Sequence, residues 1–313
     1  MRPAFLFPGQ GSQRPAMASA WRGTPQERVF TEVGHAAGMD LRALADDADR
    51  CGASTAVAQP AILAASLAAF DALTAAGVRP AVVAGHSLGE VTAAVAAEAL
   101  SPADGALLVA ERGRAMGAAC AASPGSMAAV VRLDDDALET LLRRVPAVAV
   151  ANVNAPGQAV LAGPPAAIER AGAAARELGG RLLPLDVEGA FHSAAMTSAV
   201  VRVDAVLRRL PVHDPTVTFL SGATAAALRT AGEVTRALVD GILAPVRWRE
   251  VQEQLPGLGV DLLVEVGPGG VLGGLARRTV PGIPVLSVEG PGDVAEVVDA
   301  LAGADARALP AEV

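Results

Sequence analysis

The segment PAVVAGHSLGEVTAAVAAEAL, residues 80–100, decides the fold of this chain. Its apolar start is typical of a short buried strand, and the alanine-rich part that follows is typical of a helix. The turn between them reads G-x-S-x-G, as GHSLG at 85–89. Glycines on both sides of Ser87 permit a tight strand-to-helix turn, which exposes the hydroxyl at a helix N-terminus where backbone N–H groups stabilise negative charge. The pattern predicts an α/β fold with a nucleophilic serine.

Apolar runs typical of buried strands recur along the chain, as AFLF at 4–7, VDLLVEV at 260–266 and PVLSV at 284–288. They alternate with helical segments, which indicates a parallel sheet covered by helices on both faces. Within 126–189 the order becomes strand, helix, strand, strand, helix, strand, which is the ferredoxin-like order. We therefore expect a hydrolase-like parallel-sheet domain, 1–125 and 190–313, with an inserted ferredoxin-like (βαββαβ) domain, 126–189.

The bulk composition restricts the classes of function. The formal charge is -8, aromatic residues make up 3% and tyrosine is absent, so the chain lacks the basic and aromatic surface that nucleic acid requires. Cys51 and Cys120 have no spacing typical of a disulfide framework or a metal site. No signal peptide is visible, and the apolar stretch 61–70 ends at Asp71, too short to span a bilayer. We expect a cytoplasmic protein without metal, cofactor or membrane contact.

A serine hydroxyl is a weak nucleophile unless a base takes its proton, so each of the four histidines is a candidate. His86 adjoins Ser87, but successive side chains on a sharp turn diverge, which favours a structural role. His35 and His213 lie in polar, turn-like segments, where a solvated or capping histidine is expected. His192, in VEGAFHSAAM, lies where the inserted domain returns to the large one, and such crevices favour sites. We expect Ser87 and His192 to be nucleophile and base.

The third member of a catalytic triad is not evident from the sequence. Asp186 and Glu188 lie near His192 but on the strand that enters it, where neither is well placed to orient the imidazole. A backbone carbonyl is the alternative partner for the ring.

One helix face contains an arginine among apolar residues. By helical spacing, Arg112 lies on the same face as Met116 in the helix that begins near Ser101. A buried charge needs a partner. That partner is either a substrate carboxylate, which a guanidinium binds bidentately, or an internal acid such as Glu111 or Glu90.

The opening turn FPGQG, residues 7–11, follows the first strand. It is not a dinucleotide fingerprint, because Arg14 stands where the third glycine is required. Hydrolase-like elbows take one oxyanion donor from the residue after the nucleophile, here Leu88, and a second from a loop after an early strand. The glycines around Gln10 let the backbone approach, so the N–H groups of Gln10 and Leu88 are the expected oxyanion hole.

Eight motifs occur together in the order FPGQGSQ, QPA, GHSLGE, RG, NVNAPGQ, GAFHS, PVRW and EVGPGGVL. In this set and order the chain resembles the malonyl-CoA:acyl carrier protein transacylases of fatty-acid synthesis and the acyltransferases of polyketide synthases. The resemblance covers nearly the whole chain and implies the fold expected above. It implies transfer of a malonyl group from malonyl-CoA to the phosphopantetheine thiol of an acyl carrier protein. The coenzyme A thioester is then a substrate, and no cofactor is needed. The enzyme is expected to act as a monomer.

The resemblance also implies roles for individual residues. Ser87 matches the acylated serine, His192 its base, Arg112 the residue that binds the malonyl carboxylate, and Gln10 and Leu88 the oxyanion donors. Asn152 and Asn154 match asparagines that line the cleft. His86, beside the nucleophile, and Phe191, which resembles the malonyl-type version of its motif, are further candidate substrate contacts. A main-chain carbonyl near Arg247 is implied as the partner of the histidine, and Arg247, Arg249, Arg277 and Arg278 are candidate contacts for an acidic carrier.

This chain departs from the family pattern at two places. Val91 follows GHSLGE where many members have an aromatic residue, which widens the expected pocket, and Ala244-Pro245 replaces the usual Asn-Pro, which leaves the carbonyl partner of the histidine open. The alternative functions are an acyl-thioester hydrolase that edits stalled carriers, a transacylase for a substituted malonyl unit and an idle docking module. Arg112 argues against the hydrolase, because uncharged acyl chains gain nothing from a carboxylate clamp.

Overall fold

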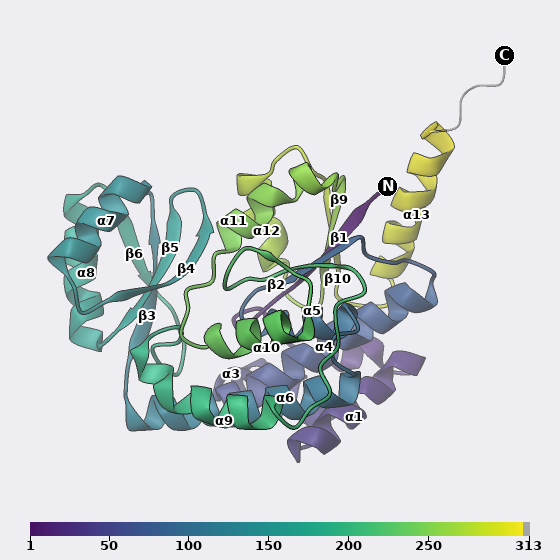
Figure 1. Cartoon of the computed structure of the whole chain (residues 1–313), viewed down its shortest axis with the longest axis horizontal. Coiled ribbons are helices and arrows are strands. Elements are labelled where there is room, and N and C mark those ends of the chain that lie inside the picture. Colours follow the sequence, from purple (N-terminus) through teal and green to yellow (C-terminus); the bar gives the residue numbers. More distant parts are fainter. Residues whose placement is uncertain (309–313) are drawn as a thin grey trace.

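The computed structural model of this chain describes residues 1–308, and they form two sheets (Figure 1). The larger sheet has the strand order β10-β9-β1-β2-β7-β8. Its strands are β1 Pro3–Phe7, β2 Val82–Gly85, β7 Thr218–Leu220, β8 Ala227–Leu228, β9 Leu262–Val266 and β10 Val285–Val288. Neighbouring strands are parallel except β7 and β8, which pair antiparallel. The predicted parallel-sheet α/β fold is confirmed.

Helices cover both faces of the large sheet because its strands are apolar on both sides. Along β1, Phe5 and Phe7 point into one core cluster and Ala4 and Leu6 into another, as the two-residue period of a strand requires. The first cluster includes side chains of α1 Arg28–Ala37, α4 Thr55–Ala75, α5 Gly89–Ala96, α6 Pro102–Ala122, α9 Thr197–Leu207, α10 Ala231–Asp240 and α13 Asp293–Ala308. The second includes side chains of α11 Trp248–Gln254 and α12 Val271–Thr279.

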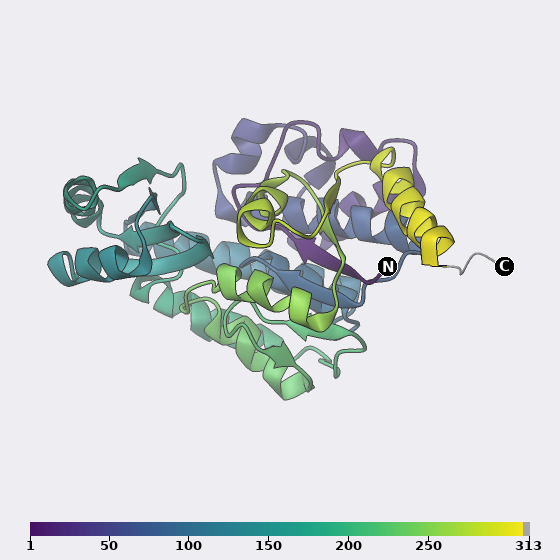
Figure 2. The same ribbon diagram turned by 90° about the horizontal axis from the view of Figure 1, so that it is seen from above.

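The smaller sheet and its two helices stand to one side of the large sheet (Figures 1 and 2). Its elements are β3 Ser126–Val131, α7 Asp135–Arg144, β4 Ala149–Ala155, β5 Gln158–Gly163, α8 Pro165–Glu177 and β6 Arg181–Pro184. The strand order is β4-β5-β3-β6, with antiparallel pairing throughout. This is the predicted ferredoxin-like arrangement, and a separate core cluster lies beneath α7 and α8. The strands fall within 126–189, while the domain boundaries stay a prediction, and 309–313 lie outside the described residues.

Helix α4 has a length and composition that would also suit a membrane span. In its most apolar window, however, 72% is buried inside the protein. Figure 1 shows it behind α5 and α10, among the helices of the large domain. The packing identifies α4 as a core helix, and no other helix of residues 1–308 meets the same criteria of length and hydropathy.

Candidate active site

The nucleophile elbow is built by close backbone contacts between β2 and α5. A Cβ atom on Gly85 would lie 2.0 Å from the carbonyl of Gly89, and one on Gly89 would lie 2.0 Å from the carbonyl oxygen of Phe7. Neither position therefore accepts a side chain. Ser87 itself has φ 53, a left-handed conformation that costs a residue other than glycine free energy. The turn thus holds the Ser87 hydroxyl out from the end of the sheet.

His192 lies against this serine, although 105 positions separate them in the sequence. The Ser87 Oγ is 2.8 Å from Nε2 of the imidazole, and Nδ1 is 2.9 Å from the carbonyl oxygen of Ala244. A carbonyl oxygen only accepts, so Nδ1 carries the proton and Nε2 is left free to accept from the hydroxyl. Burial, followed by the nearby charge of Arg112, lowers the pKa of His192 to about 3, which keeps the ring neutral.

The partner of this imidazole, which the sequence left open, is the carbonyl of Ala244, three positions before Arg247. The carbonyl of Arg247 itself accepts from the N–H of Val251 in α11 at 3.1 Å. As the sequence predicts, neither Asp186 nor Glu188 orients the ring. Glu188 instead accepts from the N–H of Thr55 at the start of α4.

Arg112 reaches the nucleophile from the middle of α6. Its side chain is buried, Nη1 donates to Oε1 of Gln59 at 2.6 Å, and Nη2 donates to Ser87 Oγ at 3.1 Å. Neither expected acid forms an ion pair with it. Glu111 pairs with Arg202, and the buried Glu90 accepts from the N–H of Gly222 while acting on Arg112 only through its charge.

This leaves the guanidinium without a carboxylate at ion-pair distance among the side chains described within residues 1–303. Burial lowers the pKa of Arg112 to about 10, so it still carries its charge at neutral pH. A buried cation held only by neutral oxygens is well suited to receive a carboxylate, because the ligand supplies the missing opposite charge.

The two expected oxyanion donors flank the same cavity. Within the described chain, neither the backbone N–H of Gln10 nor that of Leu88 donates to a protein group. The side chain of Gln10 is held by Thr55, whose hydroxyl donates to its Oε1 at 2.7 Å. Two unused N–H groups beside a serine hydroxyl are a suitable arrangement for a developing oxyanion.

Of the four other residues predicted to contact substrate, three line the cavity and one lies behind it. Asn152, Phe191 and His86 line the cavity, and Asn154 does not. Asn154 instead lies behind it, where its Oδ1 is 2.9 Å from Nε2 of His86. His86 also packs edge-on against Trp248 with ring centroids 5.5 Å apart. Burial lowers the pKa of His86, so it stays neutral and acts as part of the wall.

The cavity around Ser87 is small, with a volume of about 90 Å³. It lies between the two sheets, since the elbow, α4 and α6 form one side and residues of β3 and β4 form the other. Among residues 1–308, no group of three or more His, Cys, Asp or Glu side chains could hold a metal ion. The chemistry of the site is therefore that of a serine activated by a neutral imidazole, next to a cation.

Comparisons with known proteins agree with this geometry. Residues 4–288 match the family model described as the acyl transferase domain. The chain belongs to this family. It is 36% identical over 296 residues to the malonyl CoA-acyl carrier protein transacylase of Bacillus subtilis, covering 92% of this chain and 93% of that one. It is also 36% identical to the enzyme of the same name from Escherichia coli strain K12, covering 95% and 98%.

Solved structures give the same result for the fold. An acyl-carrier-protein S-malonyltransferase from Burkholderia pseudomallei superposes with a TM-score of 0.90 at 36% identity, covering 96% of this chain and 100% of that one. A malonyl-transacylase solved in complex with a type II PKS acyl-carrier protein also has a TM-score of 0.90, at 33% identity, covering 97% and 100%. This chain is an acyltransferase enzyme.

The acyltransferase site also contains positions that the sequence analysis did not single out. Gln59 appeared only within the QPA motif, yet it bonds Arg112 and receives support from Thr55, whose hydroxyl accepts from Gln59 Nε2 at 2.9 Å. The only sequence signal for Gln59 was a polar residue on the apolar, alanine-rich helix α4. Met116, which helical spacing already places on the same face as Arg112, completes the apolar side of the cavity.

Proposed function

We propose that this enzyme transfers a malonyl group from malonyl-CoA to the phosphopantetheine thiol of an acyl carrier protein through a malonyl ester of Ser87. The observation that carries the proposal is the buried Arg112 guanidinium, which contacts Ser87 Oγ at 3.1 Å and has no ion-pair partner among the described residues. An acyl group that reacts at Ser87 and ends in a carboxylate satisfies this charge. An acetyl group leaves it unpaired.

In the first half-reaction, His192 Nε2 takes the proton of Ser87 as Oγ attacks the thioester carbonyl. The N–H groups of Gln10 and Leu88 stabilise the oxyanion. Collapse of the tetrahedral intermediate breaks the C–S bond, and coenzyme A leaves with the proton returned by His192. In the second half-reaction, the same imidazole takes the proton of the carrier thiol, whose sulfur attacks the malonyl ester and releases the Ser87 hydroxyl.

The orientation of the base supports this assignment. The Ala244 carbonyl at 2.9 Å fixes the proton on Nδ1 and so leaves Nε2 as acceptor. We assign Asn152 and Phe191 to the wall against which the acyl group rests, where the bulk of Phe191 disfavours a branched extender. We assign Asn154 to the support of His86. No cofactor takes part, since serine, imidazole and arginine supply every proton transfer and charge that the reaction needs.

Four arginines are candidates for contact with the acidic carrier protein. Arg247 and Arg249 are paired with acids of this chain, Glu250 and Asp135 respectively. Arg277 and Arg278 at the end of α12 are exposed and have no acid partner among the side chains described within residues 1–303, although Arg278 donates to Gln158 and to the carbonyl of Pro156. We therefore infer that Arg277 and Arg278 meet the acidic carrier. We also propose a cytoplasmic monomer, because one chain provides the whole site.

The test is intact-protein mass spectrometry after brief incubation with malonyl-, methylmalonyl- and acetyl-CoA in competition. We expect one malonyl adduct, lost in Ser87→Ala and kept in Ser123→Ala, an exposed serine at the end of α6. Release of coenzyme A without a lasting adduct would favour the hydrolase instead. A methylmalonyl adduct in excess would reassign the substrate to a substituted malonyl unit.

A further inference from the structure

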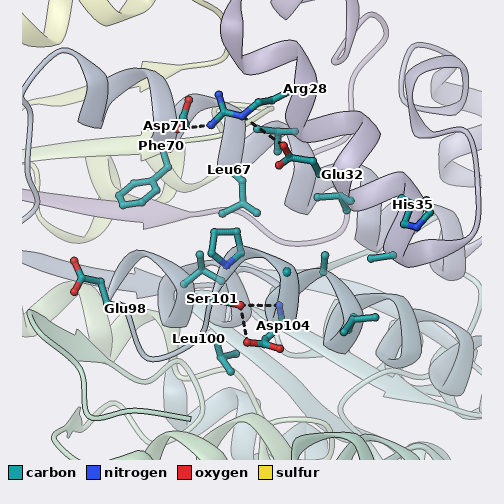
Figure 3. A pocket seen from close by; sticks show the side chains of 18 of the residues that line it. Arg28, Glu32, His35, Leu67, Phe70, Asp71, Glu98, Leu100, Ser101 and Asp104 are labelled. Carbon is teal, nitrogen blue, oxygen red and sulfur yellow. Dashed lines mark hydrogen bonds and ion pairs between the residues drawn. The ribbon is translucent and has the colours of Figure 1, made fainter. Parts of the chain in front are cut away.

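A second and larger cavity lies at the far ends of the helices that form the active site. Its volume is about 760 Å³, and it shares no lining residue with the cavity around Ser87. Helix α4 contributes Gln59 to the active site and Phe70 to this cavity, about 16 Å further along at 1.5 Å per residue. Figure 3 shows the side chains of α1 and α4 on one wall, facing Leu100, Ser101 and Asp104 on the other.

The interior of this cavity is apolar. The side chains of Val33 on α1, Leu67 and Phe70 on α4, and Leu100 before α6 all line it. Leu107 on α6 also lines it and is 46% exposed. Cavities of roughly 300 to 1,000 Å³ with apolar walls and a few polar groups are typical of small-molecule sites.

The walls are held in place by backbone hydrogen bonds. The loop between α5 and α6 is fixed to the segment after α9, because His213 N–H donates to Ala99 at 2.9 Å and Thr216 N–H donates to Ala97 at 2.9 Å. This loop includes Glu98 in a left-handed conformation, with φ 60. The cavity is therefore preformed, and a ligand would not need to order its walls.

The charges at the rim are unbalanced. Four carboxylates line the cavity, together with the imidazoles of His35 and His213 and a single guanidinium, that of Arg28, which is already bound to Asp71 at 3.2 Å and Glu32 at 3.5 Å. The dashed lines in Figure 3 join these three residues on one wall. Glu98 and Asp104 on the opposite side have no cationic partner among the side chains described within residues 1–303. Their negative charge attracts a cation and repels an anion.

We propose that this cavity binds a small apolar molecule that carries an ammonium group. The apolar part lies against Leu67 and Phe70, where it replaces water on an apolar surface. The ammonium group lies at the rim, where the carboxylates of Glu98 and Asp104 attract positive charge. Binding there leaves Ser87 and Arg112 open, since the two cavities are separate.

The test is isothermal titration of the full chain with three probes of equal chain length, octylammonium, octanoate and octan-1-ol. We expect octylammonium to bind about tenfold more tightly than octanoate, with octan-1-ol between them, because the carboxylates at the rim attract the ammonium group and repel the carboxylate. Glu98→Gln combined with Asp104→Asn should reduce the difference between the two ions to less than about threefold. Ser87→Ala should leave all three affinities unchanged, which separates this site from the acyl site.

A variant that fills the cavity locates the binding. Leu67→Trp should abolish octylammonium binding while malonyl transfer and the thermal unfolding transition are kept, and Ala36→Trp, on the α1 wall, serves if the first variant does not fold. Octylammonium binding that survives the filled cavity overturns the site. Equal binding of octanoate overturns the charge preference, and absence of binding by all three probes overturns the proposal.

Discussion

Replacing Arg112 by Ala tests the role of the buried cation most directly. The change removes the donor that lies 2.6 Å from Gln59 and 3.1 Å from Ser87 Oγ, and with it the charge available to a substrate carboxylate. Removing one partner of a buried, hydrogen-bonded charge pair costs about 2 to 5 kcal/mol. With tenfold per 1.4 kcal/mol, we expect kcat/KM for malonyl-CoA to fall by about 30-fold to several thousand-fold. The rate with acetyl-CoA, which has no carboxylate, should fall by less than about threefold.

The assay is stopped-flow acylation with each thioester, followed by the ratio of the two kcat/KM values. Arg114→Ala is the matched control, since Arg114 lies on the same helix, is largely exposed and donates to the carbonyl of Ala37, away from the site. Arg114→Ala should change neither the ratio of the two kcat/KM values nor the acylation rate with either thioester. Equal losses with malonyl-CoA and acetyl-CoA in Arg112→Ala would refute the reasoning, because they would mean that Arg112 supports the site generally and does not recognise the carboxylate.

Three further predictions concern the groups around the serine. His192→Ala should slow acylation of Ser87 by about 10²- to 10⁴-fold without loss of folding, measured by single-turnover mass spectrometry. Asn154→Ala should lower the free energy of unfolding by about 1 to 3 kcal/mol in urea melts, because it leaves a buried ring nitrogen of His86 unpaired. Burial raises the pKa of Glu90 from 4.5 to about 7, so its contribution to stability is full below about pH 4.5 and is lost as the pH rises through about 7. The Tm of Glu90→Gln relative to the unmodified protein should therefore increase between pH 5 and 8, and a constant difference would contradict the shift.

Much of the fold could be predicted because its main elements have strong local signals. The predicted order of strands and helices within 126–189 is found, with α7 at Asp135–Arg144 and β5 at Gln158–Gly163. The strands β7 and β8 could not be predicted, because with three and two residues they are too short to show the alternating pattern of a strand. Helix α10 was missed although its capping box was present, in which Thr230 and Glu233 each bond the other's backbone.

The site was predictable to the level of residue types but not of contacts. The sequence identifies Ser87 by its glycine turn and His192 by its place where the inserted domain rejoins the large domain. It identifies Arg112 by its charge on an apolar helix face. The partner of His192 is a backbone carbonyl, that of Ala244, and every residue has one, so no pattern distinguishes it. The contact of Arg112 with Gln59 depends on how α4 and α6 pack, which sequence spacing within either helix does not determine.

Arg112 and His192 also influence each other, and this coupling gives a last prediction. Burial contributes most to the low pKa of His192, and the charge of Arg112 lowers it further. A malonyl carboxylate bound to the guanidinium would offset that charge, so the imidazole becomes a better base when malonyl is in place. An acetyl group brings no such compensation. The same arginine therefore selects the acyl group twice, by binding it and by adjusting the base that activates the serine.

The sign follows from electrostatics, since a nearby cation disfavours the imidazolium. Arg112→Ala should raise the pKa of His192, and Arg114→Ala should leave it unchanged. The measurement is an NMR titration of the imidazole in isotopically labelled protein, with His192→Gln used to assign its signal among the four histidines. An unchanged or lower pKa in Arg112→Ala would contradict the coupling, and would leave Arg112 with carboxylate binding as its single function.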